Sequence, residues 1–306
     1  MSTPNPPRFA APNLPSLRQL EYLVAVVELR HFTRAAAACF VTQPTLSAGI
    51  AELEAQLGVP VLERGRSGVW PTPLGVELAE RARHILAATS DLCDRAQAEA
   101  DPLSTTLRLG AIPTLAPFVF PRVVRSLTAA HPRLRLAVRE DTSAQLLARL
   151  RDGRVDVAIL ALPFDTGELA VQPIGRDELV LALAPGRAAP EGGRLDPARL
   201  VLLTEGHCLR EHTLVACGAA ARAGELEASS LLTLVQMVAA GLGDALLPAL
   251  ALGTGLVESA GLQIHRLQPP PTRTIALVTR PSYTRPAVSA AVATALAGIL
   301  DRPAAA

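Results

Sequence analysis

Two cysteines in the C-terminal half, Cys208 and Cys217, stand in a context that could carry redox chemistry. Cys208 follows a glycine turn at Gly206, at the expected start of a helix, with the imidazole of His207 beside it and the guanidinium of Arg210 two residues on. A helix N-terminus and neighbouring cations favour the thiolate form of a cysteine. A thiolate can attack the O–O bond of a peroxide to give a sulfenic acid, and a second thiol can convert that acid to a disulfide. Cys217 is the candidate second thiol.

The spacing of the two cysteines would make their disulfide a conformational switch. In a continuous helix, nine steps of about 1.5 Å place the two Cα atoms roughly 13 Å apart, whereas a disulfide tolerates about 7 Å at most. Bond formation would therefore unwind or refold the segment. Closing so small a loop would stabilise the oxidised conformation by about 2 to 3 kcal/mol if the native strain is small, enough to bias a two-state interface about a hundredfold.

Two other interpretations of this segment remain open. Cysteines among alanines and leucines are most often small buried side chains without chemistry. His207, Cys208, His212 and Cys217 also offer nitrogen and sulfur ligands for zinc or another thiophilic metal, although their spacing matches no familiar zinc pattern. Because the chain has only 4 cysteines, a disulfide-stapled secreted scaffold is excluded.

The elements that must position this segment alternate between strands and helices. Strands are predicted at 107–112, 134–138 and 155–160, with helices at 117–130 and 143–152, and a second set has strands at 179–184, 201–203 and 275–278 and a helix at 231–240. The alternation predicts open, largely parallel sheets in two lobes with a cleft between them. Ligands of such sheets bind at the strand carboxyl ends, so Thr114 and Ser143 are candidates for the cleft. Hydroxyls at these places can equally be helix caps.

The N-terminal third has the pattern of a helix-turn-helix. A first helix begins near residue 17, Thr33 is the predicted N-cap of a second, and Thr42 is the predicted N-cap of a third that ends at Gly58. The apolar residues of the third helix would bury its back and leave Gln43, Thr45 and Ser47 near its exposed N-terminal end, where a recognition helix presents side chains to base edges.

A small hairpin is predicted after the third helix, and it is typical of a wing. It carries Arg64 and Arg66 at its tip, where arginines are suited to phosphate contacts. Net charge lends no support to DNA binding, because residues 1–72 hold six Arg against five Glu. A three-helix interaction module with a solvated polar face is the alternative interpretation.

A long helix is predicted from Thr72-Pro73 onward, and it carries a coiled-coil pattern. Apolar or small residues recur at alternating steps of four and three, at Leu78, Ala82, Ile85, Thr89, Leu92 and Ala96. The pattern predicts a dimer; packing of the helix on the protein's own body is the alternative.

Composition excludes several classes of function. The formal net charge is +1, and hydrophobic residues make up 49% of the chain, which excludes a disordered protein. All basic residues besides histidine are arginines, so lysine-dependent Schiff-base and P-loop chemistry is excluded. No apolar run reaches the length of about 18 residues that spans a bilayer, and the first residues form a polar arm, so a cytoplasmic location is expected.

Several N-terminal segments in order resemble the LysR-type transcriptional regulators. They are LRQLEYLV at 17–24, FTRAA at 32–36, QPTLS at 43–47, LEAQLG at 53–58 and LER at 62–64. The resemblance implies a winged helix-turn-helix, a dimerising linker helix, an effector domain of two α/β lobes similar to periplasmic binding proteins, and a tetrameric assembly. Ala51 and Glu52 depart from the family, since relatives often have basic residues there.

The cysteine segment itself resembles the peroxide-sensing branch of that family. GHCLR at 206–210 with Cys217 carries this resemblance, together with IPT at 112–114, QLLA at 145–148, MVAAG at 237–241, LLPAL at 246–250 and RTIALV at 273–278. It implies that Cys208 is the peroxidatic thiol, that Cys217 resolves it, and that Thr114, His207 and Arg273 hold or polarise the peroxide. Ser143 stands where a threonine is usual and Glu211 where an aspartate is usual, and both are further candidates for the peroxide site.

The expected fold is therefore α/β, with an N-terminal winged helix-turn-helix dominated by helices and a two-lobed effector domain. The expected boundaries are 14–72 for the DNA-binding domain, 73–100 for the linker helix, 105–176 with 282–306 for the first lobe and 177–281 for the second. DNA contacts are expected from Arg34, Thr42, Gln43, Pro44, Thr45, Ser47, Arg64 and Arg66. The expected partners are promoter DNA, RNA polymerase, hydrogen peroxide and further copies of the chain, with no cofactor, metal or membrane.

Three functions compete at this point. The first is a redox-switched activator of antioxidant genes. The second is a regulator that holds a small metabolite between the lobes and has inert cysteines. The third is a thiol peroxidase, which would leave the winged helix and the linker helix without a role, so we expect no enzyme.

Overall fold

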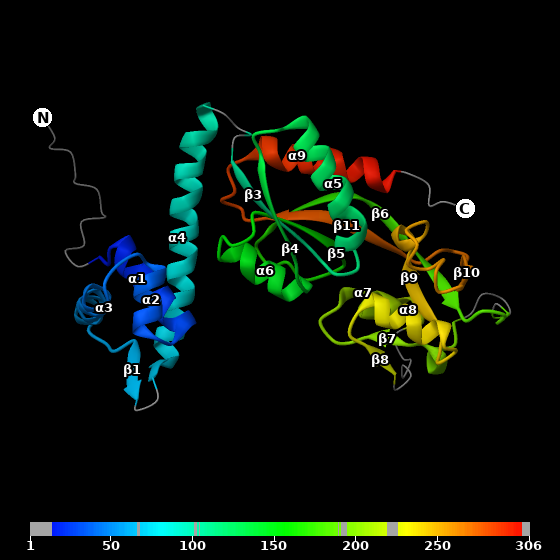
Figure 1. Cartoon of the computed structure of the whole chain (residues 1–306), viewed down its shortest axis with the longest axis horizontal. Helices are drawn as coiled ribbons and strands as arrows, with labels where there is room; N and C mark the ends of the chain where they lie inside the picture. Colours follow the sequence, from blue (N-terminus) through cyan, green and yellow to red (C-terminus); the bar gives the residue numbers. More distant parts are fainter. Residues whose placement is uncertain are drawn as a thin grey trace, which may run out of the picture. The chain divides into compact units, whose positions relative to one another are not determined.

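The computed structural model describes residues 14–65, 68–100, 103, 105–188, 190, 195–218 and 226–301. The chain divides into two units, Met1–Leu92 with Arg151–Gly153, and Cys93–Leu150 with Arg154–Ala306 (Figure 1). Among the helices of the described residues, none is both long enough and apolar enough to cross a membrane.

Three short helices open the first unit: α1 (Leu17–Leu29), α2 (Phe32–Ala38) and α3 (Gln43–Leu57). The Thr42 side chain accepts a hydrogen bond from the Thr45 N–H, and Gly58 ends α3 in the left-handed region at φ 71°, so both predicted ends of α3 are confirmed. The predicted N-cap of α2 is wrong. His31, not Thr33, precedes the first helical turn, and its ring accepts from the Arg34 N–H.

The core of the first unit joins the three helices to a hairpin. The buried residues of this core are Tyr22, Leu23, Val26, Ala35, Ala36, Leu46, Ile50, Leu53, Val61, Leu62, Val69 and Ala79. The hairpin consists of β1 (Leu62–Gly65) and β2 (Gly68–Pro71), which pair antiparallel. Arg66 and the side chain of Arg64 lie outside the described part of the chain, so the predicted arginine tip stays a prediction.

The long helix α4 (Pro73–Ala100) is continuous, as its pattern predicts. Its start is capped by Thr72, whose Oγ1 accepts from the Gly75 N–H at 2.9 Å. The first turns of α4 pack on the core of the first unit through Ala79. Farther along, Ile85 and Leu92 are 48% and 70% exposed, so the helix presents apolar side chains that the described residues leave uncovered.

One seven-stranded sheet organises the second unit. Its strands run in the order β10 (Gln263–His265), β6 (Ala170–Leu183), β11 (Thr272–Thr279), β5 (Val157–Leu162), β3 (Thr106–Ala111) and β4 (Arg135–Glu140), and β9 (Ala245–Pro248) also pairs with β6. In this sheet β4 and β5 pair parallel with β3, while β11, β9 and β10 pair antiparallel with their neighbours. The expectation of a largely parallel sheet is therefore wrong: the returning strand β11 lies between β5 and β6 and runs against both.

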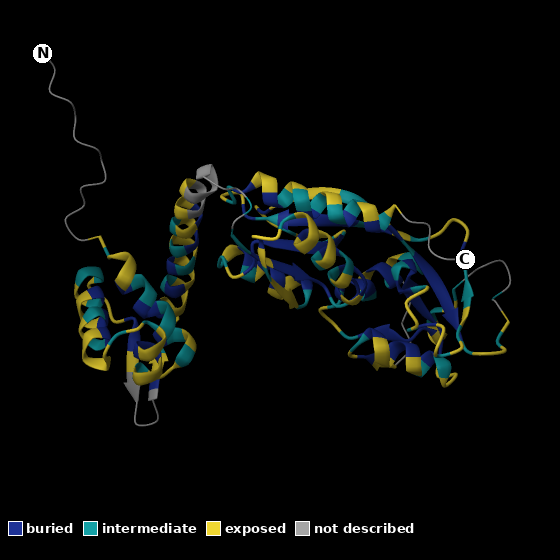
Figure 2. Cartoon of the chain, turned by 45° about the horizontal axis from the view of Figure 1, so that its top comes forward, coloured by how far each residue is buried: buried dark blue, intermediate teal, exposed yellow. Residues whose placement is uncertain are grey.

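The second unit has two hydrophobic clusters, and β6 passes from one to the other. The first cluster holds β3, β5 and β11 with helices α5 (Ala116–Ala130), α6 (Ser143–Arg151) and α9 (Pro286–Leu300). The second holds the last residues of β6 with β9 and α8 (Leu231–Ala239), beside the short pair β7 (Leu202–Leu203) and β8 (Glu227–Ala228). The strand at Ile275–Val278, assigned from sequence to the second set, packs in the first cluster. Figure 2 shows the buried residues gathered on the strands, with exposed residues on the outer faces of the helices.

We expect the change Thr72→Ala to destabilise the first unit by about 1 kcal/mol, because the hydroxyl caps α4 and also donates to the carbonyl oxygen of Val61 or Pro60. Thermal unfolding followed by circular dichroism measures this loss. Thr72→Ser is the matched control and should retain most of the stability, since serine supplies the same oxygen. An unchanged melting temperature in Thr72→Ala would show that the cap contributes nothing.

Candidate functional site

The helix α7 (Cys208–Ala216) carries both cysteines of the predicted pair. Cys208 is its first residue and is only 3% exposed, while Cys217 is the residue that ends the helix and is half-buried. Gly206 precedes the helix at φ 91°, a conformation that side chains rarely adopt. Both cysteines are unbridged thiols. The helix between them is continuous, so the separation of about 13 Å expected for helical geometry applies.

A fully buried ion pair lies beside Cys208. Arg273 on β11 is 1% exposed, its Nε donates to Asp177 Oδ2 at 3.0 Å, and its Nη2 lies 2.9 Å from the same oxygen in an ion pair. The same guanidinium donates through Nη1 to Thr114 Oγ1 at 2.8 Å and through Nη2 to the Thr114 carbonyl oxygen at 3.1 Å. Asp177 uses its second oxygen to accept from the Leu250 N–H at 3.3 Å. This network fixes Thr114, at the end of the turn after β3.

A narrow pocket, too small in this conformation to hold a water molecule, brings the thiol together with three of the predicted residues. It is lined by Ile112, Pro113, Thr114, Thr142, Ser143, Gly206, His207 and Cys208. Ser143 opens α6 and is fully buried; its Oγ meets no partner with normal hydrogen-bond geometry among the described residues, yet it lies close enough to the thiol to lower the pKa of Cys208. The cavity therefore offers two buried hydroxyls and an imidazole next to one sulfur atom.

The electrostatics of the thiol differ from the sequence prediction. Burial raises the pKa of Cys208 above its ordinary value, and the positive charge of Arg273 and the Ser143 hydroxyl offset this only in part. Arg210, predicted to favour the thiolate, instead donates to the Leu203 carbonyl oxygen and pairs with Glu227 at 2.6 Å. Burial also lowers the pKa of His207, which keeps its ring neutral near pH 7. The cation that acts on the thiol is Arg273, which is distant from Cys208 in the sequence but near it in the fold.

Two other charged or polar residues of α7 take unexpected places. Glu211, predicted at the peroxide site, is exposed and outside the lining of the narrow cavity, and its charge acts to raise the pKa of Cys208. His212 is 7% exposed, and among the described residues neither of its ring nitrogens has a partner with normal hydrogen-bond geometry. Burial, with the nearby charge of Arg273, lowers the pKa of His212 to about 4, and the backbone of Leu162 offsets this only in part. The sequence indicates His212 only as a possible metal ligand, although its position one helical turn after Cys208 places both side chains on the same face of α7.

No metal centre forms among the residues that the structure describes, since they contain no group of three or more His, Cys, Asp and Glu side chains placed to hold an ion. His207, Cys208, His212 and Cys217 all belong to those residues. The metal interpretation therefore has no support.

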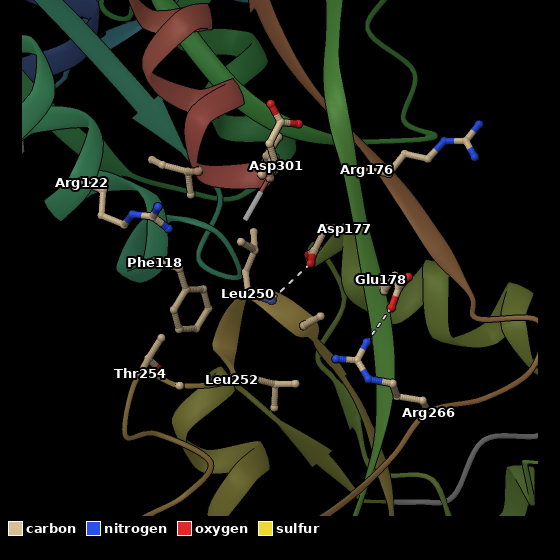
Figure 3. A pocket seen from close by; sticks show the side chains of 14 residues that line it. Phe118, Arg122, Arg176, Asp177, Glu178, Leu250, Leu252, Thr254, Arg266 and Asp301 are labelled. Atoms are coloured by element: carbon tan, nitrogen blue, oxygen red, sulfur yellow. Dashed lines mark hydrogen bonds and ion pairs between the residues drawn. The ribbon is translucent and has the colours of Figure 1, made fainter. Parts of the chain in front are cut away.

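A second, larger cavity of about 710 Å³ is lined in part by Asp177. Figure 3 shows Phe118, Leu250 and Leu252 along its apolar side, with Arg122 directed toward the same space. Arg266 pairs with Glu178 at 2.9 Å at its edge. Asp177 thus lines the larger cavity and also accepts a hydrogen bond from Arg273. Through Arg273 the larger cavity is connected to the thiol site.

Two family descriptions match the chain, and together they span most of it. Residues 17–76 match the bacterial regulatory helix-turn-helix protein of the lysR family, and residues 100–299 match the LysR substrate binding domain. The chain belongs to the LysR family. The winged helix-turn-helix and the two-lobed effector domain expected from sequence are confirmed by these matches.

Individual LysR-family proteins are similar over nearly the whole length. The chain is 43% identical to the HTH-type transcriptional regulator EstR of Acinetobacter baylyi, covering 88% of this chain and 92% of the relative. It is 41% identical to a probable hydrogen peroxide-inducible genes activator of Streptomyces viridosporus, covering 92% and 93%. The structure of a full-length OxyR variant from Pseudomonas aeruginosa matches with a TM-score of 0.76 at 33% identity, covering 92% of this chain and 94% of that one.

In this LysR-family chain the N-terminal end of α3 is open to solvent. Thr42, Gln43, Pro44 and Thr45 are exposed, as is Arg34 on α2, while Ser47 is half-buried. The Thr33 hydroxyl donates to Gln43 Oε1 at 3.0 Å, which restrains the Gln43 amide. Most side chains predicted to contact DNA from α3 are therefore accessible, and their contacts with bases stay a prediction.

We expect His212 to make the reduced protein less stable as the pH falls from 6.5 to about 4. The unfolded imidazole binds a proton near pH 6.5, whereas the folded one does so only near pH 4, so the unfolded state gains protons first. The loss is at most about 3 to 4 kcal/mol, since each unit of pKa difference corresponds to about 1.4 kcal/mol. His212→Leu should reduce this pH dependence and raise stability at pH 7, because it removes two buried nitrogens that lack well-formed hydrogen bonds.

Denaturant unfolding of the reduced wild type and His212→Leu at several pH values tests this expectation. The comparison cancels the carboxylates that the two proteins share. Parallel pH profiles in the two proteins would show that His212 titrates normally.

Proposed function

We propose that this LysR-family regulator senses hydrogen peroxide through Cys208 and Cys217 and controls the transcription of antioxidant genes. One observation carries the proposal: a buried thiol lines the same narrow pocket as the hydroxyls of Thr114 and Ser143, and the second thiol ends the same helix. The similarity to a peroxide-inducible activator and to an OxyR structure supports it.

The first chemical step forms a sulfenic acid. The sulfur of Cys208, after losing its proton, attacks one oxygen of the peroxide, the O–O bond breaks, and the leaving hydroxide takes up a proton as water. Thr114 Oγ1 accepts a hydrogen bond from Arg273, so the hydroxyl hydrogen of Thr114 is available to donate toward the peroxide. Ser143 and His207 add polar groups to the same cavity, and the charge of Arg273 favours the thiolate and the developing negative charge.

The second step joins the two ends of α7. The sulfur of Cys217 attacks the sulfur of Cys208, the S–O bond breaks, and a second water leaves. The thiol pair is thereby oxidised by two electrons and the peroxide is reduced to water. Because helical geometry separates the two Cα atoms by about 13 Å, α7 must unwind for this bond to form.

Unwinding of α7 would change packing contacts in both hydrophobic clusters. Cys208 packs in the first cluster, whereas its neighbour Leu209 packs in the second. Withdrawal of Cys208 from the first cluster therefore changes the contacts that α7 makes with both parts of the unit. In the proposal this rearrangement alters the association of chains on promoter DNA.

The remaining assignments follow the same proposal. The domain bounds stay those expected from sequence, 14–72, 73–100, 105–176 with 282–306, and 177–281, although β11 within the last range packs in the first cluster. The exposed Ile85 and Leu92 on α4 support a dimer through that helix, with a tetramer as the full assembly. The protein acts in the cytoplasm as a stoichiometric sensor rather than an enzyme, and RNA polymerase is its partner at activated promoters.

A second candidate function rests on the larger cavity. A volume of about 710 Å³ lined by apolar and charged side chains suits a small polar metabolite. The Acinetobacter relative is named without reference to peroxide. A metabolite-responsive regulator of this kind would act independently of its thiols.

Peptide mapping by mass spectrometry after about one equivalent of hydrogen peroxide separates the two functions. We expect a Cys208–Cys217 crosslink in the wild type and none in Cys208→Ser or Cys217→Ser, with a sulfenic acid retained on Cys208 in Cys217→Ser. Cys39→Ser and Cys93→Ser are the matched controls and should crosslink normally. Unmodified thiols under conditions that oxidise a control sensor would exclude peroxide sensing and favour the metabolite function.

Hydrogen exchange tests the unwinding of α7 directly. We expect amides of residues 212–217, protected by helical hydrogen bonds in the reduced protein, to exchange at least tenfold faster after oxidation. Cys217→Ser treated with peroxide is the control, because it forms the sulfenic acid without the disulfide and should keep its protection. Equal protection in both redox states of the wild type would contradict the switch.

A further inference from the structure

The turn between α2 and α3 exposes an aromatic ring almost completely. Phe40 is 93% exposed, the highest value among the large apolar side chains of the described residues. Its backbone lies in the left-handed region at φ 55°, where residues with side chains are strained and glycine or asparagine is more usual. Phe40 thus neither packs in the core nor suits its own backbone.

Hydrogen bonds on both sides hold this turn in place. The Val41 N–H donates to the Ala36 carbonyl oxygen at 3.0 Å, and the Phe40 N–H donates to the Ala37 carbonyl oxygen at 3.2 Å. From α1, the Arg18 guanidinium donates to the Cys39 carbonyl oxygen at 3.0 Å. The left-handed conformation is therefore imposed by the helix-turn-helix itself, and a smaller residue would occupy it with less strain.

A residue that opposes local stability and buries nothing is expected where function requires it. Phe40 stands two residues before Thr42, which caps the N-terminus of α3. Thr42, Gln43 and Thr45 are exposed at that end. In a helix-turn-helix these N-terminal residues meet the base edges in the major groove, so a duplex bound by them passes close to Phe40.

We propose that Phe40 is a DNA-contact residue whose ring packs on an apolar part of the duplex, a thymine methyl or a deoxyribose, at the margin of the surface met by α3. Phenylalanine and other apolar side chains make such contacts with thymine methyl groups. The charged neighbours fit the same partner, since Arg18 lies at the turn and Arg34 is exposed on α2. The proposal depends on DNA binding by the LysR-family domain and not on peroxide sensing.

The variants Phe40→Gly and Phe40→Asn separate the ring from the backbone, because both residues tolerate the left-handed conformation. Full-length reduced protein is titrated by fluorescence anisotropy with labelled duplexes that the wild type enriches from a random pool. We expect both variants to melt no lower than the wild type and to bind about tenfold more weakly, the affinity that partial burial of one ring provides.

The salt dependence and a control variant sharpen the test. Because no phosphate contact is lost, the slope of log K against log salt concentration should match that of the wild type. Leu242→Asn, which changes an exposed leucine of the second unit, should bind DNA normally. Duplexes with deoxyuridine in place of thymidine distinguish the two contacts. If the wild type then binds no more tightly than Phe40→Gly, the ring contacts the thymine methyl group. If the wild type still binds more tightly, the ring contacts the deoxyribose.

Equal affinity of Phe40→Gly and the wild type would overturn the proposal, as would a weaker affinity accompanied by a lower melting temperature in both variants. Loss of transcription in vitro with unchanged DNA affinity would also overturn it, because the ring would then serve a contact with RNA polymerase.

Discussion

The ion pair between Arg273 and Asp177 is the interaction on which the rest of the effector unit depends. Both side chains are almost wholly buried, and an isolated charge there would be strongly destabilising, so each requires the other. The pair joins the neighbouring strands β11 and β6, and β6 runs through both hydrophobic clusters. Arg273 then directs its remaining donors to Thr114, and Asp177 accepts from Leu250. One electrostatic contact thus fixes the strands, the wall of the thiol cavity and the wall of the larger cavity.

This arrangement places opposing demands on Cys208. The first cluster gains a small apolar side chain, and burial holds its pKa above the ordinary value. The positive charge of Arg273 lowers the pKa of Cys208. This electrostatic attraction is stronger where water is excluded. The thiol is therefore shielded from bulky oxidants and alkylating agents by its burial, while a small oxidant that reaches the narrow cavity meets a sulfur atom beside a fixed positive charge.

Local features of this chain could be predicted from sequence because their causes are local. Thr42, Gly58 and Thr72 mark helix ends through contacts within a few residues, and the alternation of strands and helices follows from periodicity. The partner of Arg273 could not be predicted, since it lies 96 residues away and no spacing rule connects the two. The role predicted for Arg210 is wrong for the same reason. Its nearness in sequence to Cys208 indicated that it favours the thiolate, but its guanidinium contacts Leu203 and Glu227 instead. The direction of β11 likewise depends on where the chain returns, not on the residues of the strand.

His212 limits how strongly α7 packs against the rest of the effector unit. A helix that must unwind cannot be docked as firmly as a permanent core element, because every favourable contact of the reduced state opposes oxidation. Two buried ring nitrogens without well-formed hydrogen bonds reduce the stability of the docked helix, whereas a leucine in the same place would add to it. His212 lies on the same face of α7 as Cys208 and is also buried. In the proposed switch, the unwinding that withdraws the thiol would also return the His212 ring to water. The two nitrogens without well-formed hydrogen bonds therefore lie in the helix that the proposed disulfide would require to open.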